Sequence, residues 1–246
     1  MALIRETGPA GALELECADT WLSRWRCASI LRGDTYPVLP VGEDVKTIVD
    51  VGANCGATSV LLAARYPAAT VHALEPGSEA FAMLRRNSER QPGIVPHNVG
   101  LSDRSGEATL YLGELDTGTS SIFAPVGAAA SETVSLRAAD EWLEEQGVER
   151  IDVLKVDVEG SELPVLGSMA RWLPSVRLIH IEYGGKGTGR EIDDLLRDSH
   201  LLALGSIMLT HGEVTYVAEE LAGDEMILAI GELTRRRVLA QARIED

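Results

Sequence analysis

The chain has 246 residues, a formal net charge of −16 and a hydrophobic content of 45%. This length suits one α/β domain with additions, and the composition suits a soluble globular protein. The acidic balance argues against tight binding to nucleic acid or to an anionic membrane, because both need clustered Lys and Arg. We therefore expect a small-molecule substrate and neither a nucleic-acid nor a membrane partner, while a homo-oligomer stays open.

Cysteine usage and the absence of apolar runs bear on the compartment. Cys17, Cys27 and Cys55 form an odd, widely spaced set that lacks zinc-binding spacing. The N-terminal segment does not resemble a secretory signal, and no apolar run approaches the roughly 20 residues that cross a bilayer. These features predict a cytoplasmic protein.

The first 45 residues precede the strongest strand signal and are expected to form an N-terminal helical and strand addition beside the site. Leu13 to Cys17 alternates apolar with acidic residues, a pattern typical of a half-buried strand. Asp19 or Thr20 is suited to cap a following helix. Residues 46–246 are predicted to form the main domain.

From residue 46 onward, strand patterns alternate with helix patterns. Strands are predicted over 46–51, 70–74, 94–99, 107–112, 151–156 and 176–181, and helices over 57–65, 78–90, 138–146, 163–169 and 191–199. The last third adds strand patterns over 201–209, 213–217 and 226–230, and residues 113–131 predict a long loop. The alternation predicts a mainly parallel sheet covered on both faces, with ligands beyond the carboxyl ends of its strands.

The most informative segment is the loop of small residues between the strand that ends at Val51 and the helix that begins at Ala57. Gly52, Asn54 and Gly56 allow a close approach of backbone to a ligand and aim the helix N-terminus at it. A dinucleotide fingerprint needs glycine at its first, third and sixth positions, and only Gly52 fits. An NAD(P)-dependent oxidoreductase therefore stays an alternative with weaker support.

Further polar residues follow the next two strands. Glu75 comes after the second strand, near the spacing at which a carboxylate accepts hydrogen bonds from ribose hydroxyls. After the third strand, Leu101 is suited to cover an adenine, and Asp103 is suited to accept from its amino group. The alternative to a binding role is that Glu75 closes a simple turn, and that Ser102 and Asp103 form a capping pair or a turn.

The fourth strand ends in a charged group. Lys155, Asp157 and Glu159 alternate along the chain, so in extended backbone they share one face. Their apolar neighbours predict a central strand, where charges are costly unless they are paired or used. The alternative to a functional role is an ion pair between Lys155 and a neighbouring carboxylate.

Together these segments resemble the FkbM family of S-adenosylmethionine-dependent methyltransferases. The resemblance covers about residues 45–182 and is carried by residues 48–56, 73–76, 98–103 and 151–162, of which the last is the most family-specific. It implies a Rossmann-like, seven-stranded class I methyltransferase sheet with an antiparallel strand near one edge. It also implies methyl transfer, most often to a hydroxyl oxygen of a sugar, polyketide or other secondary metabolite.

The resemblance assigns S-adenosylmethionine as the cofactor. The residues expected to hold it lie at the ends of four strands: Asp50, Gly52, Asn54, Gly56, Glu75, Leu101, Ser102, Asp103 and Asp157. Residues 119–121 resemble a serine-bearing stretch that the family places near the site. Ala139 stands where a leucine is usual, a departure that concerns packing more than chemistry.

An acceptor hydroxyl has to lose its proton, which calls for a base within hydrogen-bond reach. Asp157 and Glu159 are the first candidates, because the exit of the fourth strand faces the methyl group in this fold. His180 and Glu182 on the next strand are second, although His180 between two isoleucines is more typical of a core histidine. A divalent metal on the three carboxylates stays open without being predicted. A non-catalytic partner subunit is the remaining alternative.

Overall fold

The computed structural model describes residues 1–112, 120–121 and 130–242. Most of the predicted loop at 113–131 therefore lies outside the described residues, as does Thr119. Ser120 and Ser121 are described as the short strand β8 (Ser120–Ser121).

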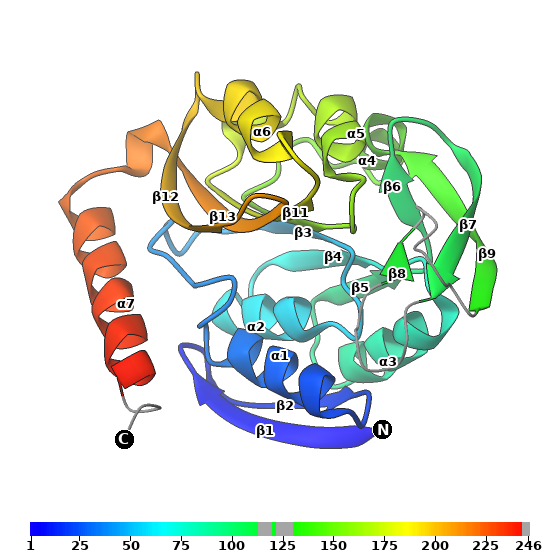
Figure 1. Cartoon of the computed structure of the whole chain (residues 1–246), viewed down its shortest axis with the longest axis horizontal. Coiled ribbons are helices and arrows are strands. Elements are labelled where there is room, and N and C mark those ends of the chain that lie inside the picture. The colour runs from blue at the N-terminus through cyan, green and yellow to red at the C-terminus, as the bar shows by residue number, and fades with distance from the viewer. Residues whose placement is uncertain (113–119, 122–129, 243–246) are drawn as a thin grey trace.

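The centre of the molecule is a seven-stranded sheet (Figure 1). Its order is β12-β13-β11-β10-β3-β4-β5, and every adjacent pair is parallel except the two pairs that β13 makes. The predicted class I methyltransferase sheet, with one antiparallel strand next to an edge, is thereby confirmed. The strands are β3 (Thr47–Val51), β4 (Thr70–Leu74), β5 (Ile94–His97), β10 (Val153–Asp157), β11 (Leu178–Gly184), β12 (His200–Ile207) and β13 (His211–Ala218).

Helices cover both faces of this sheet, as predicted (Figure 1). Each face has its own cluster of buried apolar side chains, because a central parallel strand buries residues on both sides. One face carries α1 (Trp21–Leu31), α2 (Ala57–Arg65) and α3 (Ser78–Ser88), and the other carries α4 (Ala139–Glu145), α5 (Glu162–Ser168) and α6 (Thr188–Leu196). Two short 3-10 helices, Leu173–Ser175 and Glu219–Leu221, lie in connections.

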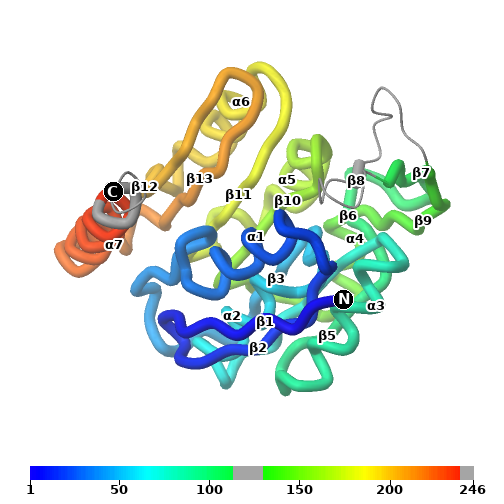
Figure 2. Tube along the Cα trace, turned by 60° about the horizontal axis from the view of Figure 1, so that its bottom comes forward, coloured from blue at the N-terminus to red at the C-terminus, as the bar shows by residue number. Residues whose placement is uncertain are grey.

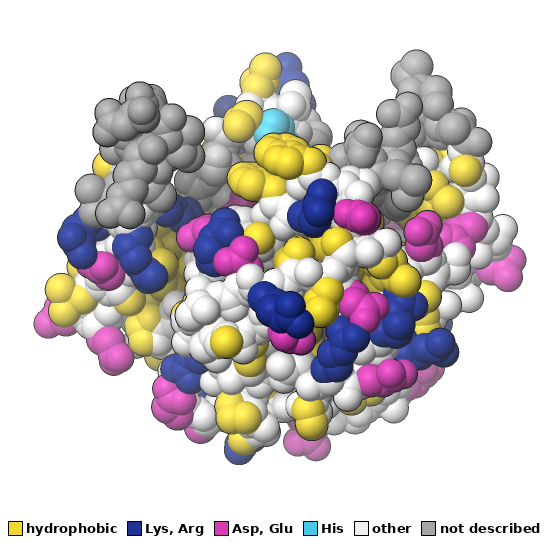
Figure 3. Space-filling model, turned by 90° about the horizontal axis from the view of Figure 1, so that it is seen from below, with side chains coloured by type: hydrophobic (Ala, Val, Ile, Leu, Met, Phe, Trp, Pro, Cys, Tyr) yellow, Lys and Arg dark blue, Asp and Glu magenta, His cyan; other side chains and the backbone are white. Residues whose placement is uncertain are grey.

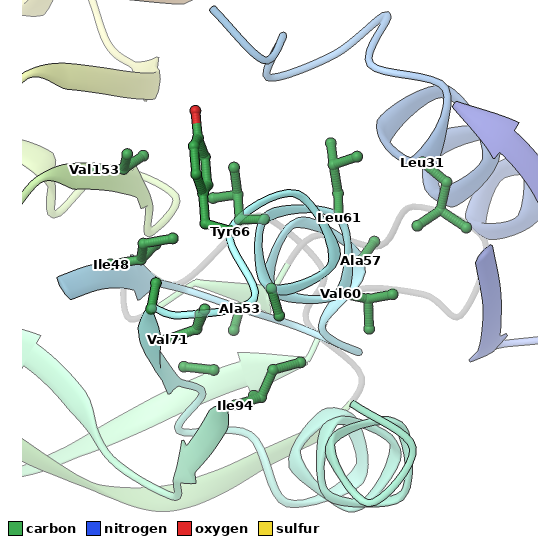
Figure 4. Close-up of a cluster of buried hydrophobic side chains, with 14 of the residues drawn as sticks. Leu31, Ile48, Ala53, Ala57, Val60, Leu61, Tyr66, Val71, Ile94 and Val153 are labelled. Carbon is green, nitrogen blue, oxygen red and sulfur yellow. The ribbon is translucent and has the colours of Figure 1, made fainter. Parts of the chain in front are cut away.

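The N-terminal addition is a hairpin of β1 (Ala2–Gly8) and β2 (Gly11–Cys17) followed by α1. Thr20 caps α1 by accepting from the amide of Ser23 at 3.2 Å. In Figure 4, α2 lies between the sheet and this addition, with Ile48 on the sheet side and Leu31 on the other side. The addition therefore shares a core with the main sheet and is anchored against the helix that follows the first glycine loop (Figure 2).

A second, four-stranded sheet stands beside the main one, in the order β6-β9-β7-β8. It contains β6 (Gly100–Ser102), β7 (Gly106–Leu112) and β9 (Ala130–Ala138) besides β8. The sequence predicts β7 but not β9, whose polar residues from Ser131 to Thr133 do not show the apolar alternation of a half-buried strand.

The strand predicted at residues 226–230 is wrong. This segment begins α7 (Asp224–Ala242), which lies at the margin of the molecule (Figure 1). Met226 and Leu233 are buried and Ile230 is partly buried, a spacing of four and three residues that matches one face of a helix. A five-residue apolar run does not by itself distinguish a strand from such a helix.

No helix in the described ranges is long and apolar enough to cross a membrane. On the face drawn in Figure 3, Lys and Arg side chains are interspersed with Asp and Glu.

Candidate functional site

The loop between β3 and α2 is held in an unusual backbone conformation. Gly52, Asn54 and Gly56 have φ angles of 76°, 51° and 91°, in the left-handed region. The amides of Gly52 and Ala53 donate to the carbonyl oxygen of Leu74 at 3.0 and 2.8 Å. The loop is therefore tied to the end of β4, and its glycines supply the conformations that other residues adopt at a cost.

Gly52 also brings the exit of β3 against the exit of β10. A Cβ atom on Gly52 would lie 1.8 Å from the carbonyl oxygen of Asp157, so only a glycine fits there. The first and fourth strand ends, which the sequence analysis singled out separately, are in direct backbone contact.

Glu75 links the loop after β3 to the turn after β4. Its Oε2 accepts from the amide of Asn54 and its Oε1 from the amide of Gly77, both at 2.8 Å. The side chain is buried, and burial raises the pKa of Glu75 to about 7 against the opposing effect of these two amides. Each carboxylate oxygen accepts one backbone bond and retains a second lone pair.

The residues predicted around an adenine occupy a different element from the main sheet. Leu101 and Ser102 lie on β6, at 2% and 7% exposure, and Leu101 belongs to the core on the α4 side. Asp103 is exposed, and its Oδ1 accepts from the Ser102 hydroxyl at 3.2 Å. Asn98 connects this region to the site by donating to the carbonyl of Glu75 at 2.9 Å.

Asp50 and Lys155 form a buried ionic centre beneath the loop. Lys155 Nζ lies 3.2 Å from Asp50 Oδ1 and 3.7 Å from Asp157 Oδ2, and it donates to the carbonyl of Gly52 at 2.6 Å. Burial favours the neutral amine, but the charges of Asp50 and Asp157 raise the pKa of Lys155. The ammonium therefore fixes the first loop carbonyl, and the ion pair considered as an alternative for Lys155 is present.

Asp50 lies beneath the loop and contacts α2 as well as Lys155. Its side chain is fully buried, and its Oδ2 accepts from the hydroxyl of Ser59 on α2 at 2.6 Å. Its position makes it a support for Lys155 and for the start of α2.

Three carboxylates gather at the exits of β10 and β11. Asp157 and Glu182 are register partners on these parallel strands, and their side chains are 19% and 30% exposed. Glu159 follows with a left-handed backbone, φ 51°. Burial, and then the charges of Asp157 and Glu182, raise the pKa of Glu159 to about 7.

His180, the alternative base, is enclosed in the core. Its ring is fully buried, with Nδ1 3.0 Å from the hydroxyl of Thr215. Burial, assisted by the charge of Lys155, lowers the pKa of His180 to about 3, which makes the ring a weak proton acceptor. These contacts favour the core interpretation of this histidine.

Two residues of the N-terminal addition reach the carboxylates. Arg26 on α1 donates through Nη2 to both oxygens of Glu182, at 3.1 and 2.9 Å. The Tyr36 hydroxyl lies 3.1 Å from Asp157 Oδ2 and 3.1 Å from Glu182 Oε2. Sequence reasoning missed both residues, because neither stands in a motif and both lie far along the chain from their partners.

Within the described ranges, no group of three or more His, Cys, Asp or Glu side chains is placed to hold a metal ion. The three cysteines are free and buried, and Cys27 Sγ lies 3.5 Å from Cys55 Sγ. They join the N-terminal addition to the loop after β3 by packing.

Sequence comparisons agree with this geometry. The sequence model of the methyltransferase FkbM domain matches residues 50–201. The hexuronic acid methyltransferase AglP of Haloferax volcanii is 31% identical over 181 residues, which are 72% of this chain and 73% of that protein. The 31-O-demethyl-FK506 methyltransferase FkbM of Streptomyces tacrolimicus is 31% identical, over 61% of this chain and 70% of that protein.

A further methyltransferase and a solved structure are also similar to this chain. The 2-O-methyltransferase NoeI of Sinorhizobium fredii is 28% identical over 63% of this chain and 73% of that protein. Among solved structures, the fibrillarin of Aeropyrum pernix with natively bound S-adenosyl-L-methionine has a TM-score of 0.47 and 14% identity, over 78% of this chain and 74% of that one. The matched domain spans every strand end described above, and the chain belongs to the FkbM family of S-adenosylmethionine-dependent methyltransferases.

Proposed function

We propose that this enzyme methylates a hydroxyl oxygen of a small cytoplasmic acceptor, a sugar or another natural product, and that Glu159 accepts the hydroxyl proton. The observation that carries the proposal is the carboxylate group Asp157, Glu159 and Glu182, which adjoins the cofactor loop. Gly52 touches the backbone of Asp157, so the loop and the carboxylates form one continuous site.

The loop residues fit the cofactor. S-adenosylmethionine, which supplies an electrophilic methyl group on a positively charged sulfur, would be held by Gly52, Asn54, Gly56 and Glu75. Glu75 has one lone pair left on each oxygen for the ribose hydroxyls, because each already accepts one backbone amide. Lys155 keeps the loop in place through the Gly52 carbonyl.

Glu159 has a pKa that is matched to neutral solution. A general base works best when its pKa lies near the working pH, and that of Glu159 is raised to about 7. Glu182 is engaged by Arg26, and the pKa of His180 is too low for this task. Asp157 is placed to accept a hydrogen bond from the same hydroxyl and so to orient it.

The charge of the site favours a neutral acceptor group. In the described part of the chain, Arg26 lies near Asp157, Glu159 and Glu182, and Lys155 lies near Asp157 and Glu182. A carboxylate acceptor would be repelled and would need no base, whereas a hydroxyl needs one. The names of related enzymes support this chemistry, since one is a 2-O-methyltransferase and another acts on 31-O-demethyl-FK506.

The test is incubation with methyl-labelled S-adenosylmethionine and defined acceptors, followed by mass spectrometry. A methyl glucuronide, a neutral methyl glycoside and a fractionated metabolite extract cover the acceptor classes. We expect the label in an alkali-stable ether, and its loss in Glu159→Gln.

An alkali-labile ester on the glucuronide would show transfer to a carboxyl and would contradict the hydroxyl assignment. Binding of S-adenosylhomocysteine by calorimetry, with NADH as the comparison ligand, checks that the loop is loaded during the assay. Tight cofactor binding without transfer to any acceptor would favour the partner-subunit alternative.

A further inference from the structure

Tyr36 has an unusual combination of backbone and burial. Its φ is 52°, in the left-handed region that bulky side chains rarely adopt, and the next residue is Pro37, before which extended backbone is normal. The residue is nevertheless 2% exposed. Strained residues of this kind persist where surrounding contacts hold them, and they concentrate at functional sites.

The hydroxyl of Tyr36 connects the two strands that carry the candidate catalytic groups. It lies 3.1 Å from Asp157 Oδ2 on β10 and 3.1 Å from Glu182 Oε2 on β11, and it has one proton to donate between them. Lys155 approaches the same oxygen of Asp157, at 3.7 Å. Both contacts involve Oδ2 of Asp157, and neither involves Oδ1. Together they hold the carboxylate group in one orientation.

The surroundings of Tyr36 close this part of the site. Its ring centroid lies 5.6 Å from Lys155 Nζ and 5.7 Å from the ring of His180. Arg26 secures Glu182 from α1, and the charge of Glu213 on β13 also acts on the Tyr36 hydroxyl. The tyrosine ring thus covers the buried ionic centre, where ion pairs are strongest when water is kept out.

Resting on the proposed function, we propose that Tyr36 is a positioning residue for methyl transfer. Its hydroxyl ties Asp157 to Glu182 and turns Asp157 Oδ1 toward the acceptor hydroxyl. The residue comes from outside the matched family domain, residues 50–201, so the N-terminal addition completes the acceptor side of the site. Tyr36 neither takes up the proton nor contacts the methyl group.

The kinetic test compares two tyrosines that each carry a buried hydroxyl. Tyr36→Phe removes the bridge, whereas Tyr66→Phe removes a hydroxyl that donates to the Leu39 carbonyl at 3.4 Å. We expect Tyr36→Phe to lower kcat about 10- to 100-fold, in the range for losing an orienting contact, with unchanged affinity for S-adenosylhomocysteine. Tyr66→Phe keeps the wild-type kcat.

The inference is overturned if Tyr36→Phe has the wild-type kcat while Glu159→Gln, as a separate variant, is inactive. The proposed function would then still stand. Loss of cofactor affinity in step with kcat would also overturn it, because a general disturbance of the fold is then the cause. An increased kcat would instead show that Tyr36 blocks the site.

A second measurement needs no acceptor. Asp157→Asn and Glu182→Gln are combined in a double-mutant cycle, and folding equilibria are measured in urea. We expect the coupling between these residues to differ between the wild-type and Tyr36→Phe backgrounds, because direct repulsion between the two carboxylates remains in both and only the contribution of the shared hydroxyl is removed. Equal coupling in both backgrounds would show that the hydroxyl does not connect the two carboxylates, and would overturn the inference even if no acceptor had been found.

Discussion

The two sides of the site are built in different ways. On the cofactor side, the residues proposed to hold the cofactor, Gly52, Asn54, Gly56 and Glu75, lie in one stretch of chain, and Glu75 reaches Asn54 across 21 residues. On the acceptor side, the key contacts join distant segments: Tyr36 to Asp157 spans 121 residues and Arg26 to Glu182 spans 156. The cofactor side is therefore encoded by a local motif, whereas the acceptor side exists only once the whole domain has folded.

The two sides also balance charge differently. Glu75 is stabilised by two backbone amides, which come with the loop conformation itself. The acceptor-side carboxylates depend on Arg26, Tyr36 and Lys155. A substitution on the cofactor side should thus change cofactor affinity or stability, and one on the acceptor side should change turnover.

The largest effect is expected from Glu159→Gln, which removes the proposed base. Turnover should fall about 10²- to 10⁴-fold, the usual contribution of general base catalysis, with little change in cofactor affinity. The wild-type rate should rise with pH through about 7, because Glu159 must be ionised to accept a proton, and the variant should lack this limb. Steady-state rates between pH 5.5 and 8.5, roughly 1.5 units on each side of that pKa, measure both effects.

Stability gives an independent check on the same residue. The folded pKa of Glu159, about 7, lies above its ordinary value of 4.5, so this group favours folding most below pH 4.5 and loses that contribution as pH rises through 7. Glu159→Gln should flatten this part of the curve of unfolding free energy against pH. A rate profile that keeps its limb in the variant would remove the base assignment from Glu159.

The next effect tests the contact between the two sides. Gly52→Ala places a Cβ atom against the Asp157 carbonyl at a positive φ, so the loop or the exit of β10 must shift. We expect a loss of about 2–4 kcal/mol of unfolding free energy, the upper part of the range for backbone strain and overpacking. Urea denaturation measures it. Gly147→Ala is the matched control, because its φ is also positive, at 66°, but its Cβ meets nothing within 4 Å.

Glu75→Ala tests the cofactor side alone. It removes the acceptor for the Asn54 and Gly77 amides and, in the proposed site, for the ribose hydroxyls. S-adenosylhomocysteine should therefore bind about 10- to 100-fold more weakly, or about 1.4–2.7 kcal/mol. Turnover at saturating cofactor should change much less. Calorimetric titration that returned the wild-type dissociation constant would remove Glu75 from the cofactor site and break the division between the two sides.

The same division explains which parts of the molecule could be predicted. The bounds of the helix over 57–65 and of the strand that ends at Val51 were predicted to within one residue. This was possible because the apolar run, the glycine turn and the helix lie next to each other in the chain. The family resemblance carried the number of strands in the main sheet and the antiparallel strand near its edge, which no local pattern contains. The helix α7 was mistaken for a strand because a run of five apolar residues fits both periods.

Arg26 and Tyr36 could not be predicted for a different reason. Each is an ordinary residue in its local sequence, and its role depends on where a separate hairpin and helix pack against the sheet. Lys155 shows the intermediate case, since its charge on a central strand indicated importance, but its contact with the Gly52 carbonyl depends on the loop conformation.

The smallest effect concerns Asn54, which stands between Gly52 and Gly56 and has a positive φ. Asn54→Gly should change the unfolding free energy by less than about 0.5 kcal/mol. The backbone strain that it removes at φ 51° is offset by the greater conformational freedom of glycine in the unfolded chain. It also loses the bond from the Cys55 amide to Asn54 Oδ1. Asn54→Val should cost about 1–3 kcal/mol, since a β-branched residue tolerates positive φ poorly.

Thermal unfolding of both Asn54 variants, with and without S-adenosylhomocysteine, completes the comparison. If the loop conformation is what the motif encodes, the valine variant should lose stability and cofactor affinity together, and the glycine variant should lose neither. A glycine variant that bound the cofactor much more weakly would show that the asparagine amide contacts the ligand directly. The cofactor side would then depend on a side chain as well as on the backbone, and the contrast with the acceptor side would be one of degree.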